Sequence, residues 1–429
     1  MNFNFINKIQ QIYIILLIFL FACSQNDTSI NFTISDLPED INQSIIYKTP
    51  NDDINIFKND EHYEILKSDE YTKLYWPTIS SDNSLLAYSY IKEQQTDYKI
   101  GINILNLQNL ESNEIYSSLD PTKNLLSNNI PHYMGWSPTN NILNFTTPTN
   151  NYPSLYVYKY DIDTSEKIID FGPLWVNWGE NDLLSVHRRD KRFVFEINQQ
   201  HTKLIDTESV SMFYRIDPWF YQNNKIDQIV SIYQNYDVVS IFKSDIHKNN
   251  NILITDVNEY SMINISPDKN FLSILSSETY PSSIYNNFKL VNLNSNETIL
   301  NYENYPIGYF WSPDSSKILL ITKPRNTNVY DINIVYTNDL SVRKLQSIKL
   351  SDEQLEMIVF SDQFSASHNL WSSDSSELII AGSIEFDKTV DETGINGPDN
   401  NFNIIKISNL NSNPTTTILF PGLLGYWTN

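Results

Sequence analysis

The chain has 429 residues, a formal net charge of −22 and 13 % aromatic residues. This much negative charge repels nucleic acid and anionic lipid, so we expect no nucleic-acid partner. The sequence holds 1 cysteine, which excludes a disulfide within one chain.

The first 22 residues have the pattern of an export signal. Lys8 supplies the positive end, and the apolar run Ile12–Phe21 is too short to span a bilayer as a helix. The next feature is LFAC at residues 20–23, which resembles the lipobox of bacterial lipoproteins. That resemblance implies lipidation of Cys23, a membrane partner reached through the lipid anchor, and a place in the bacterial cell envelope, periplasmic or on the outer face of a membrane. The alternative is an ordinary cleaved signal that happens to contain a cysteine.

Residues 23–44 are polar and predict a flexible tether with a root-mean-square reach of about 25 Å. Three short strands are expected next: Ile45–Lys48, Asp53–Lys58 and Tyr63–Lys67. No turn motif precedes them, but the C-terminal Leu424–Asn429 matches the strand Ile307–Ser312 and then stops. Pairing this last strand with the first three would close a ring and remove open sheet edges.

A tight turn followed by a buried strand recurs along the rest of the chain. In the clearest copy, Tyr309–Thr322, Pro313 has the fixed φ of a turn, and neighbouring serine and aspartate side chains bond nearby backbone. The strand after it is apolar at consecutive positions, as a strand covered on both faces must be. Related turns begin at Ile79, Trp136, Trp178, Ile265 and Trp371, with a degenerate copy at Trp219–Asn224. Trp136 and Trp178 are 42 positions apart, which fits four strands per repeat and predicts a β-propeller.

The W-S-P-D-[SG]-x-x-I/L pattern resembles the repeat of TolB-type, WD40-like (PD40) propellers and of the propeller domains in the prolyl oligopeptidase and dipeptidyl peptidase families. The resemblance covers about residues 45–429 and implies an all-β fold. We expect a departure from these families, because the sequence leaves no room for a separate N-terminal α/β domain and shows no hydrolase domain. We expect residues 1–22 as signal peptide, 23–44 as tether and 45–429 as one propeller domain, acting as a monomer. Eight four-stranded blades are predicted, or seven if the segment around Trp219 is not a blade.

Loop lengths predict a binding face. If strands A to D are counted outward from the axis, the A–B turns are uniformly tight, whereas B–C loops and blade connections vary in length and share the opposite face. The variable segments are Leu119–His132, Thr147–Ser154, Ser277–Asn287, Lys323–Asp331, Leu350–Asn369 and Asp387–Asn401. A rigid scaffold with variable loops is typical of a binding surface, although such loops also tolerate insertion. We expect a protein, peptide or glycan ligand on this loop-rich face.

Several residues are candidates for that site. Tyr152, Tyr280, Tyr285 and Tyr330 either contact a ligand or pack under the loops. His132 and His368 precede A strands near the axis, where they are binding candidates, but two histidines do not make a metal or acid–base site. The recurring tryptophans predict packing between blades: Trp136, Trp178, Trp311, Trp371 and Trp427. The basic run of residues 187–192 predicts a solvated hairpin tip, and Ser351–Met357 predicts a short capped helix in a connection.

The sequence contains neither G-x-S-x-G nor H-E-x-x-H, and no cofactor or metal is expected. It therefore favours a non-catalytic binding or scaffolding propeller. Two alternatives stay open, namely a glycan- or peptide-processing enzyme with its site in the axial depression, and a regulatory propeller that partners a separate hydrolase. Carboxylates converging on His132 or His368 would favour the enzyme, and an aromatic surface would favour binding.

Overall fold

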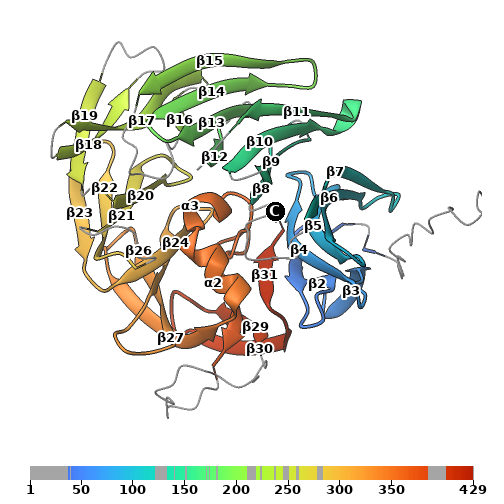
Figure 1. Cartoon of the computed structure of the whole chain (residues 1–429). Coiled ribbons are helices and arrows are strands. Elements are labelled where there is room, and N and C mark those ends of the chain that lie inside the picture. The colour runs from blue at the N-terminus through green and yellow to red at the C-terminus, as the bar shows by residue number, and fades with distance from the viewer. Residues whose placement is uncertain are drawn as a thin grey trace, which may run out of the picture.

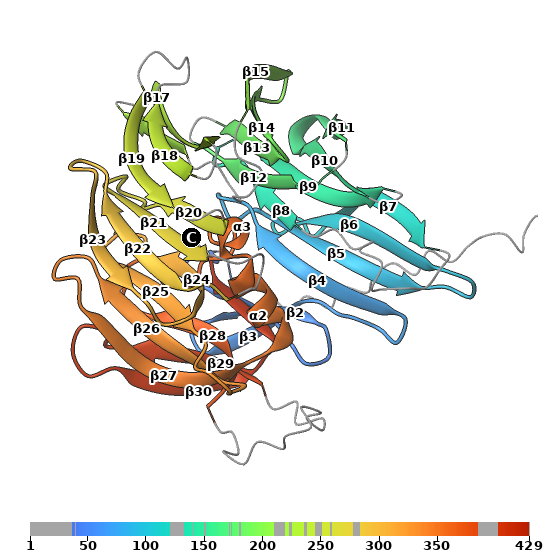
Figure 2. The same cartoon turned by 60° about the vertical axis from the view of Figure 1, so that its left-hand side comes forward.

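A computed structural model describes residues 37–38, 40–120, 133–139, 141–149, 152–170, 172, 174–179, 182–209, 219–222, 225–235, 238–244, 251–257, 260–277, 284–384 and 402–428. Their strands form small antiparallel sheets that radiate from a central axis, as Figures 1 and 2 show. This arrangement confirms the predicted all-β propeller. In the described residues, no helix is long and apolar enough to cross a membrane.

Five four-stranded sheets are built from consecutive strands. The first sheet contains β4 (Thr72–Ile79), β5 (Leu85–Glu93), β6 (Tyr98–Asn106) and β7 (Ser112–Asp120). The second contains β8 (Tyr133–Trp136), β9 (Ile142–Thr149), β10 (Tyr152–Lys159) and β11 (Thr164–Ile169), with the 3₁₀ turn η2 (Tyr160–Ile162) between the last two. The third contains β12 (Leu174–Trp178), β13 (Leu183–Arg188), β14 (Lys191–Ile197) and β15 (Thr202–Ser209). The next two are β16 (Trp219–Gln222), β17 (Lys225–Asn235), β18 (Val238–Ser244) and β19 (Asn251–Val257); and β20 (Tyr260–Ile265), β21 (Phe271–Ser277), β22 (Asn287–Asn292) and β23 (Glu297–Tyr302). The segment around Trp219 therefore forms a sheet of its own.

A seven-stranded sheet follows. Its strands are β24 (Pro306–Trp311), β25 (Lys317–Thr322), β26 (Tyr330–Tyr336), β27 (Val342–Leu350), β28 (Leu378–Ser383), β29 (Asn403–Ser408) and β30 (Thr415–Pro421). Only two residue pairs, Lys349 with Ser383 and Leu350 with Gly382, join β27 to β28. Farther along the chain, Trp371 also lies beside β28, where it forms an isolated antiparallel β-bridge with Leu378. If the two halves of this sheet are counted separately, the described sheets number eight.

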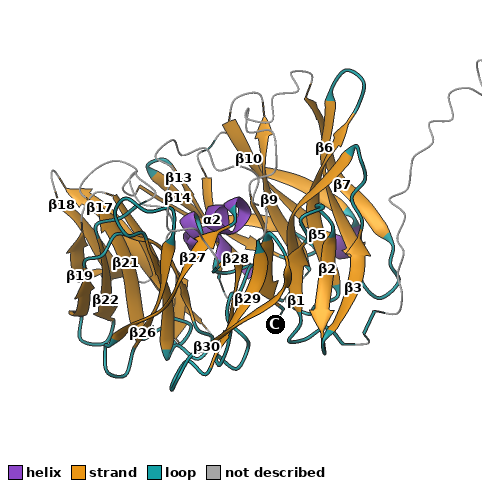
Figure 3. Ribbon diagram, turned by 90° about the horizontal axis from the view of Figure 1, so that it is seen from below, coloured by secondary structure: helices purple, strands orange, loops and turns teal. Residues whose placement is uncertain are grey.

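The last sheet joins the two ends of the chain. β1 (Ile45–Lys48), β2 (Ile54–Lys58) and β3 (Glu61–Leu66) pair in series, and β31 (Leu424–Trp427) lies antiparallel to β1, with Ile45 opposite Trp427. The predicted closure of the ring by N-terminal strands and the C-terminal strand is thus confirmed. The C-terminus lies near the centre of the ring, close to β31 (Figure 1), and toward the lower side of the ring in the view of Figure 3.

A serine shapes the tight turn at Ser80, Ser137, Ser266, Ser312 and Ser372, whereas Gly179 stands at this place after β12. In the copy at Ser312, its backbone N–H donates to the Lys317 carbonyl and its Oγ accepts the Lys317 N–H, both at 2.9 Å. Asp314 accepts from the Ser312 hydroxyl at 2.7 Å and from the Ser316 N–H at 3.0 Å. Burial alone would raise the pKa of Asp314, but these hydrogen bonds outweigh it and lower the pKa. The aspartate is a turn former, as the sequence suggested.

The two chain ends reproduce the same turn without a covalent connection. The Thr428 N–H donates to the Ser44 carbonyl and its Oγ1 accepts the Ser44 N–H, both at 2.9 Å. Thr428 therefore takes the place of Ser312. The sequence match had put Asn429 at that place, so the correspondence between the two strands is shifted by one residue. It follows that Trp427 is the counterpart of Trp311.

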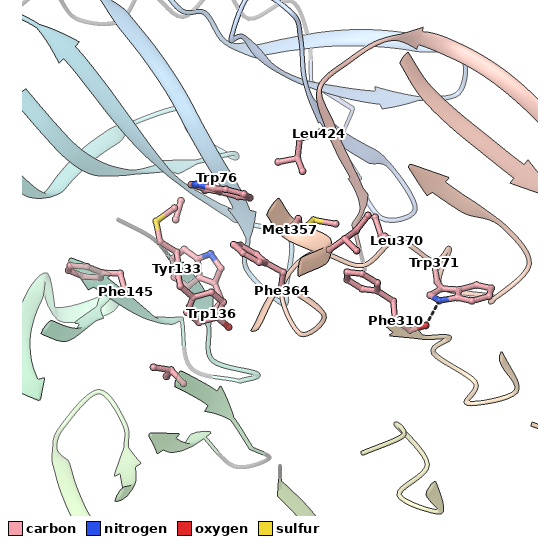
Figure 4. Close-up of a cluster of buried hydrophobic side chains, with 14 of the residues drawn as sticks. Trp76, Tyr133, Trp136, Phe145, Phe310, Met357, Phe364, Leu370, Trp371 and Leu424 are labelled. Carbon is pink, nitrogen blue, oxygen red and sulfur yellow. Dashed lines mark hydrogen bonds between the residues drawn. The ribbon is translucent and has the colours of Figure 1, made fainter. Parts of the chain in front are cut away.

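Tryptophans link successive blades. Indole N–H groups donate to the preceding blade, from Trp136 to the Thr78 carbonyl at 3.1 Å, from Trp178 to the Gly135 carbonyl at 3.1 Å, and from Trp371 to the Phe310 carbonyl at 3.0 Å. Trp311 donates to Ser273 Oγ at 3.0 Å. The Trp371 bond is dashed in Figure 4. For these four residues the predicted packing between blades is confirmed.

Candidate functional site

Two short helices occupy the centre of the ring (Figure 1). α2 (Asp352–Val359) and α3 (Ser361–Phe364) follow β27 directly. The Ser351 side chain caps α2 by accepting the Gln354 N–H at 3.2 Å, which confirms the predicted helix start. The connection Leu350–Asn369 is therefore not a surface loop as expected. We call residues 351–368 the axial plug.

The axial plug packs against the innermost strands of several blades. Phe364 stacks on Trp76 with ring centroids 4.8 Å apart and meets Tyr133 edge-on at 5.8 Å (Figure 4). A Cβ on Gly308 of β24 would lie 2.2 Å from the Ile358 carbonyl oxygen. Only glycine fits there, so the backbone of α2 lies directly on β24.

Polar contacts fix the axial plug at both ends. Lys48 of β1 is 1 % exposed and its Nζ lies 2.7 Å from Glu353 Oε1 and 2.8 Å from Asp52 Oδ1. The Lys48 ammonium also lies 4.2 Å from the centroid of the Tyr75 ring. Burial, together with the two carboxylates, raises the pKa of Tyr75 to about 12. At the other end, Asn264 Nδ2 donates to Ser365 Oγ at 3.1 Å.

The candidate His368 ends the axial plug and is buried, with 1 % exposure. Its Nδ1 lies 2.8 Å from Ser367 Oγ, and its ring centroid lies 4.5 Å from that of Tyr426. Burial lowers the pKa of His368 to about 3, so the ring is neutral at physiological pH. In the described residues no group of three or more His, Cys, Asp or Glu side chains could hold a metal.

Of the other predicted site residues, Tyr285 and Tyr330 are the ones whose side chains the structure describes. Tyr285 and Tyr330 are buried at 6 % and 8 % exposure, which corresponds to packing under the loops. Tyr152 begins β10 opposite Thr149, so the expected loop at residues 147–154 is mostly a continuation of β9 and β10. Lying outside the described residues are the Tyr152 side chain, Tyr280, His132, Cys23 and the acidic insertion after Asp387.

The basic hairpin differs from the prediction at two of its residues. His187 and Arg192 are buried, at 1 % and 0 % exposure, rather than solvated. They face each other across β13 and β14, where His187 stacks on Trp175 and the Arg192 Nη2 lies 3.0 Å from Asp206 Oδ2. Alternating residues of a strand point to opposite faces, which explains why part of a basic run is buried.

A cavity of about 270 Å³ lies where the axial plug reaches the tight-turn face. It is bounded by the last residues of β4, β8, β12 and β31 and by the end of the axial plug. Its wall includes Tyr133, Trp136, Trp178, Ser367, Asn369 and Trp427, and none of the lining residues that the structure describes is charged. We call it the axial cavity. The sequence did not predict this cavity, because the variable loops favoured a ligand site on the loop-rich face. The long connection before Trp371 was the one signal that this blade is irregular.

A larger hollow of about 670 Å³ lies over the turns of β24 to β27. Its polar groups largely bond one another or the nearby backbone. Asp339 accepts from Ser341 at 2.6 Å, and Arg343 donates to the Ser412 carbonyl at 2.6 Å. The axial cavity is the better candidate because aromatic rings from several blades converge on it beside the end of the axial plug.

The chain matches no protein-family model and no curated protein. Among solved structures it is similar to a protein from Lactobacillus plantarum, with TM-score 0.45 and 12 % identity over 71 % of this chain and 95 % of that one. It is also similar to TolB from Acinetobacter baumannii (0.38, 10 % identity, 81 % and 83 %) and to the β-propeller domain of the Trilobed protease from Pyrococcus furiosus (0.45, 11 % identity, 82 % and 99 %). At these scores the likeness carries no argument about function, and the fold assignment rests on the strand pairing itself.

Proposed function

We propose that the protein is a bacterial envelope lipoprotein, anchored through Cys23, whose propeller is a non-catalytic binding module with the axial cavity as its site. The observation that carries the proposal is the wall of this cavity, where Tyr133 and the indoles of Trp136, Trp178 and Trp427 meet neutral polar groups. Small-molecule sites are typically concave and largely apolar, with a few polar groups that orient the ligand.

The position of the tether supports an orientation on the membrane. Ser44, the residue before β1, bonds Thr428 on the tight-turn face, and Thr428 Oγ1 also donates to the Ile41 carbonyl at 2.6 Å. The chain therefore enters the ring on the face that carries the axial cavity. With a tether reach of about 25 Å, we propose that the tight-turn face, rather than the loop-rich face, is directed at the membrane and its ligand.

The anchor is tested with the full chain and its Cys23→Ala variant expressed in a bacterium. We expect the wild-type protein to fractionate with membranes and to carry a diacylglycerol-sized mass increase, whereas the variant is released without it. Because Cys23 is the chain's 1 cysteine, any thiol-linked lipid must be attached there. A wild-type protein that is soluble and unmodified would refute the anchor.

A further inference from the structure

Trp427 breaks the pattern that the other tryptophans follow. Trp136, Trp178 and Trp371 each donate the indole N–H to a carbonyl of the preceding blade. Trp427 occupies the equivalent place on β31, yet its Nε1 is buried and finds no acceptor in the described part of the chain. A buried donor without an acceptor is unfavourable, so this N–H calls for an acceptor that the described residues do not supply.

The axial plug accounts for the exception. In the blade before β31, the innermost position beside β28 is filled by two separate segments. Residues 349–350 pair with the end of β28, Trp371 pairs with its start, and the axial plug lies between these two segments in the chain. At this altered junction, the backbone N–H of Trp427 donates to the Asn369 carbonyl at 2.7 Å. The repeat is thus broken at the place where the axial cavity lies.

Asn369 adds a second donor to the cavity wall. Its Oδ1 accepts the backbone N–H of Trp371 at 3.1 Å, which fixes the orientation of the amide. The Nδ2 group then keeps its hydrogens for another acceptor, because no bond from it occurs among the described residues.

These features define the chemistry of a fitting ligand. Two N–H donors require acceptor oxygens, while the indole and phenol rings require an apolar surface. An anion is disfavoured by the net charge of −22, and a cation would meet two donors and, among the described lining residues, no carboxylate. A volume of about 270 Å³ holds one ring rather than a chain. A pyranose combines hydroxyl acceptors with an apolar ring face.

We propose that the axial cavity binds a single neutral sugar ring, free or at the end of a glycan, with hydroxyl oxygens that accept from Asn369 Nδ2 and, once the indole shifts to expose it, from the buried Trp427 Nε1. This inference rests on the proposed binding function and names the ligand class for it.

The test is calorimetric titration of the purified full-length protein with glucose, galactose, mannose and N-acetylglucosamine, free and as methyl glycosides. We expect saturable binding of at least one sugar with a dissociation constant of the order of 1 mM. Equal affinity for the free sugar and its glycoside would indicate that a glycan end is also accepted, whereas preference for the free sugar would restrict the site to monosaccharides. Binding of no sugar would overturn the proposal.

Variants locate the binding. Asn369→Asp keeps the acceptor for the Trp371 N–H but removes the amide donor, and Trp427→Phe removes the indole donor. Each should weaken sugar binding about 3- to 10-fold. The matched control is Trp311→Phe, because Trp311 is the counterpart of Trp427, bonds Ser273 Oγ and does not line the cavity. Sugar binding that both cavity variants leave unchanged would lie elsewhere and would refute the proposal.

A neutral peptide probe separates the ligand class from the binding function. The capped dipeptide acetyl-Gly-Pro-amide offers acceptors and an apolar ring but no sugar. If this probe binds and the two cavity variants weaken it while sugars do not bind, the ligand class is wrong and the binding site stands. If neither sugars nor the probe bind, the inference and the proposed binding function fail together.

Discussion

At the scale of the residue, the candidate histidine His368 is buried and is therefore not accessible to a ligand. His368 looked from the sequence like an accessible group near the axis. Its ring instead lies between Phe364, Tyr426 and Ser367, with centroid distances of 5.2 Å to Phe364 and 4.5 Å to Tyr426. The position of His368 before an A strand does not show that the axial plug, which ends at this residue, packs in the centre of the ring and buries it.

This burial has a consequence for the pH dependence of stability. Since the folded pKa of His368 is about 3, the unfolded chain takes up a proton first when the pH falls below about 6.5. His368 alone should therefore lower the free energy of unfolding by about 1 kcal/mol per pH unit as the pH falls below 6.5, down to about pH 4, where carboxylates begin to contribute. Urea unfolding at pH 7.5 and 5.5 should show this loss in the wild-type protein and a smaller one in His368→Phe. The exposed His201→Gln serves as control, and an equal pH dependence in all three would contradict the assignment.

At the scale of the element, the turns and the plug differ in how far the sequence determines them. The serine and aspartate of the clearest turn bond to neighbours within five residues, as Ser312 does with Lys317, so their local pattern was sufficient. The helix start at Ser351 was equally local. The place where the axial plug packs could not be predicted from local sequence, because Phe364 contacts Trp76 and Tyr133, which lie far away in the chain.

The packing of the axial plug predicts a large effect at Phe364, which is 3 % exposed. Phe364→Ala should leave a cavity between Trp76 and Tyr133 and lower the free energy of unfolding by about 3–5 kcal/mol. Phe360→Ala is the control, because Phe360 lies on the same segment with 39 % exposure and should cost less than about 1 kcal/mol. Chemical denaturation measures both, and similar losses for the two variants would mean that the centre of the ring is not packed as described.

At the scale of the whole molecule, the repeat period and the incomplete C-terminal copy were enough to predict a ring closed by its two ends. The axial cavity was beyond the sequence, because it depends on how the interrupted blade meets β31. Asn369 and Trp427 come together only through that junction, and neither residue type distinguishes it from an ordinary repeat.

The closing turn makes a sharp prediction for Thr428, which is 2 % exposed. Thr428→Val preserves the shape of the side chain but leaves the buried Ser44 N–H without its acceptor and removes the donor to Ile41. We expect a loss of about 1–3 kcal/mol in the free energy of unfolding, measured in urea, whereas Thr428→Ser keeps the hydroxyl and most of the stability. If the valine variant is as stable as the serine variant, the hydroxyl does not hold the ring closed.

The central claim is that the axial cavity at the broken junction binds the ligand. The most direct measurement is the ¹⁵N–¹H spectrum of the indole groups, of which the chain has 8, recorded during titration with the tightest-binding sugar. The signal that Trp427→Phe removes should shift most, and the signal that Trp311→Phe removes should stay in place. A titration in which the Trp427 signal does not move would show that the cavity is not the binding site.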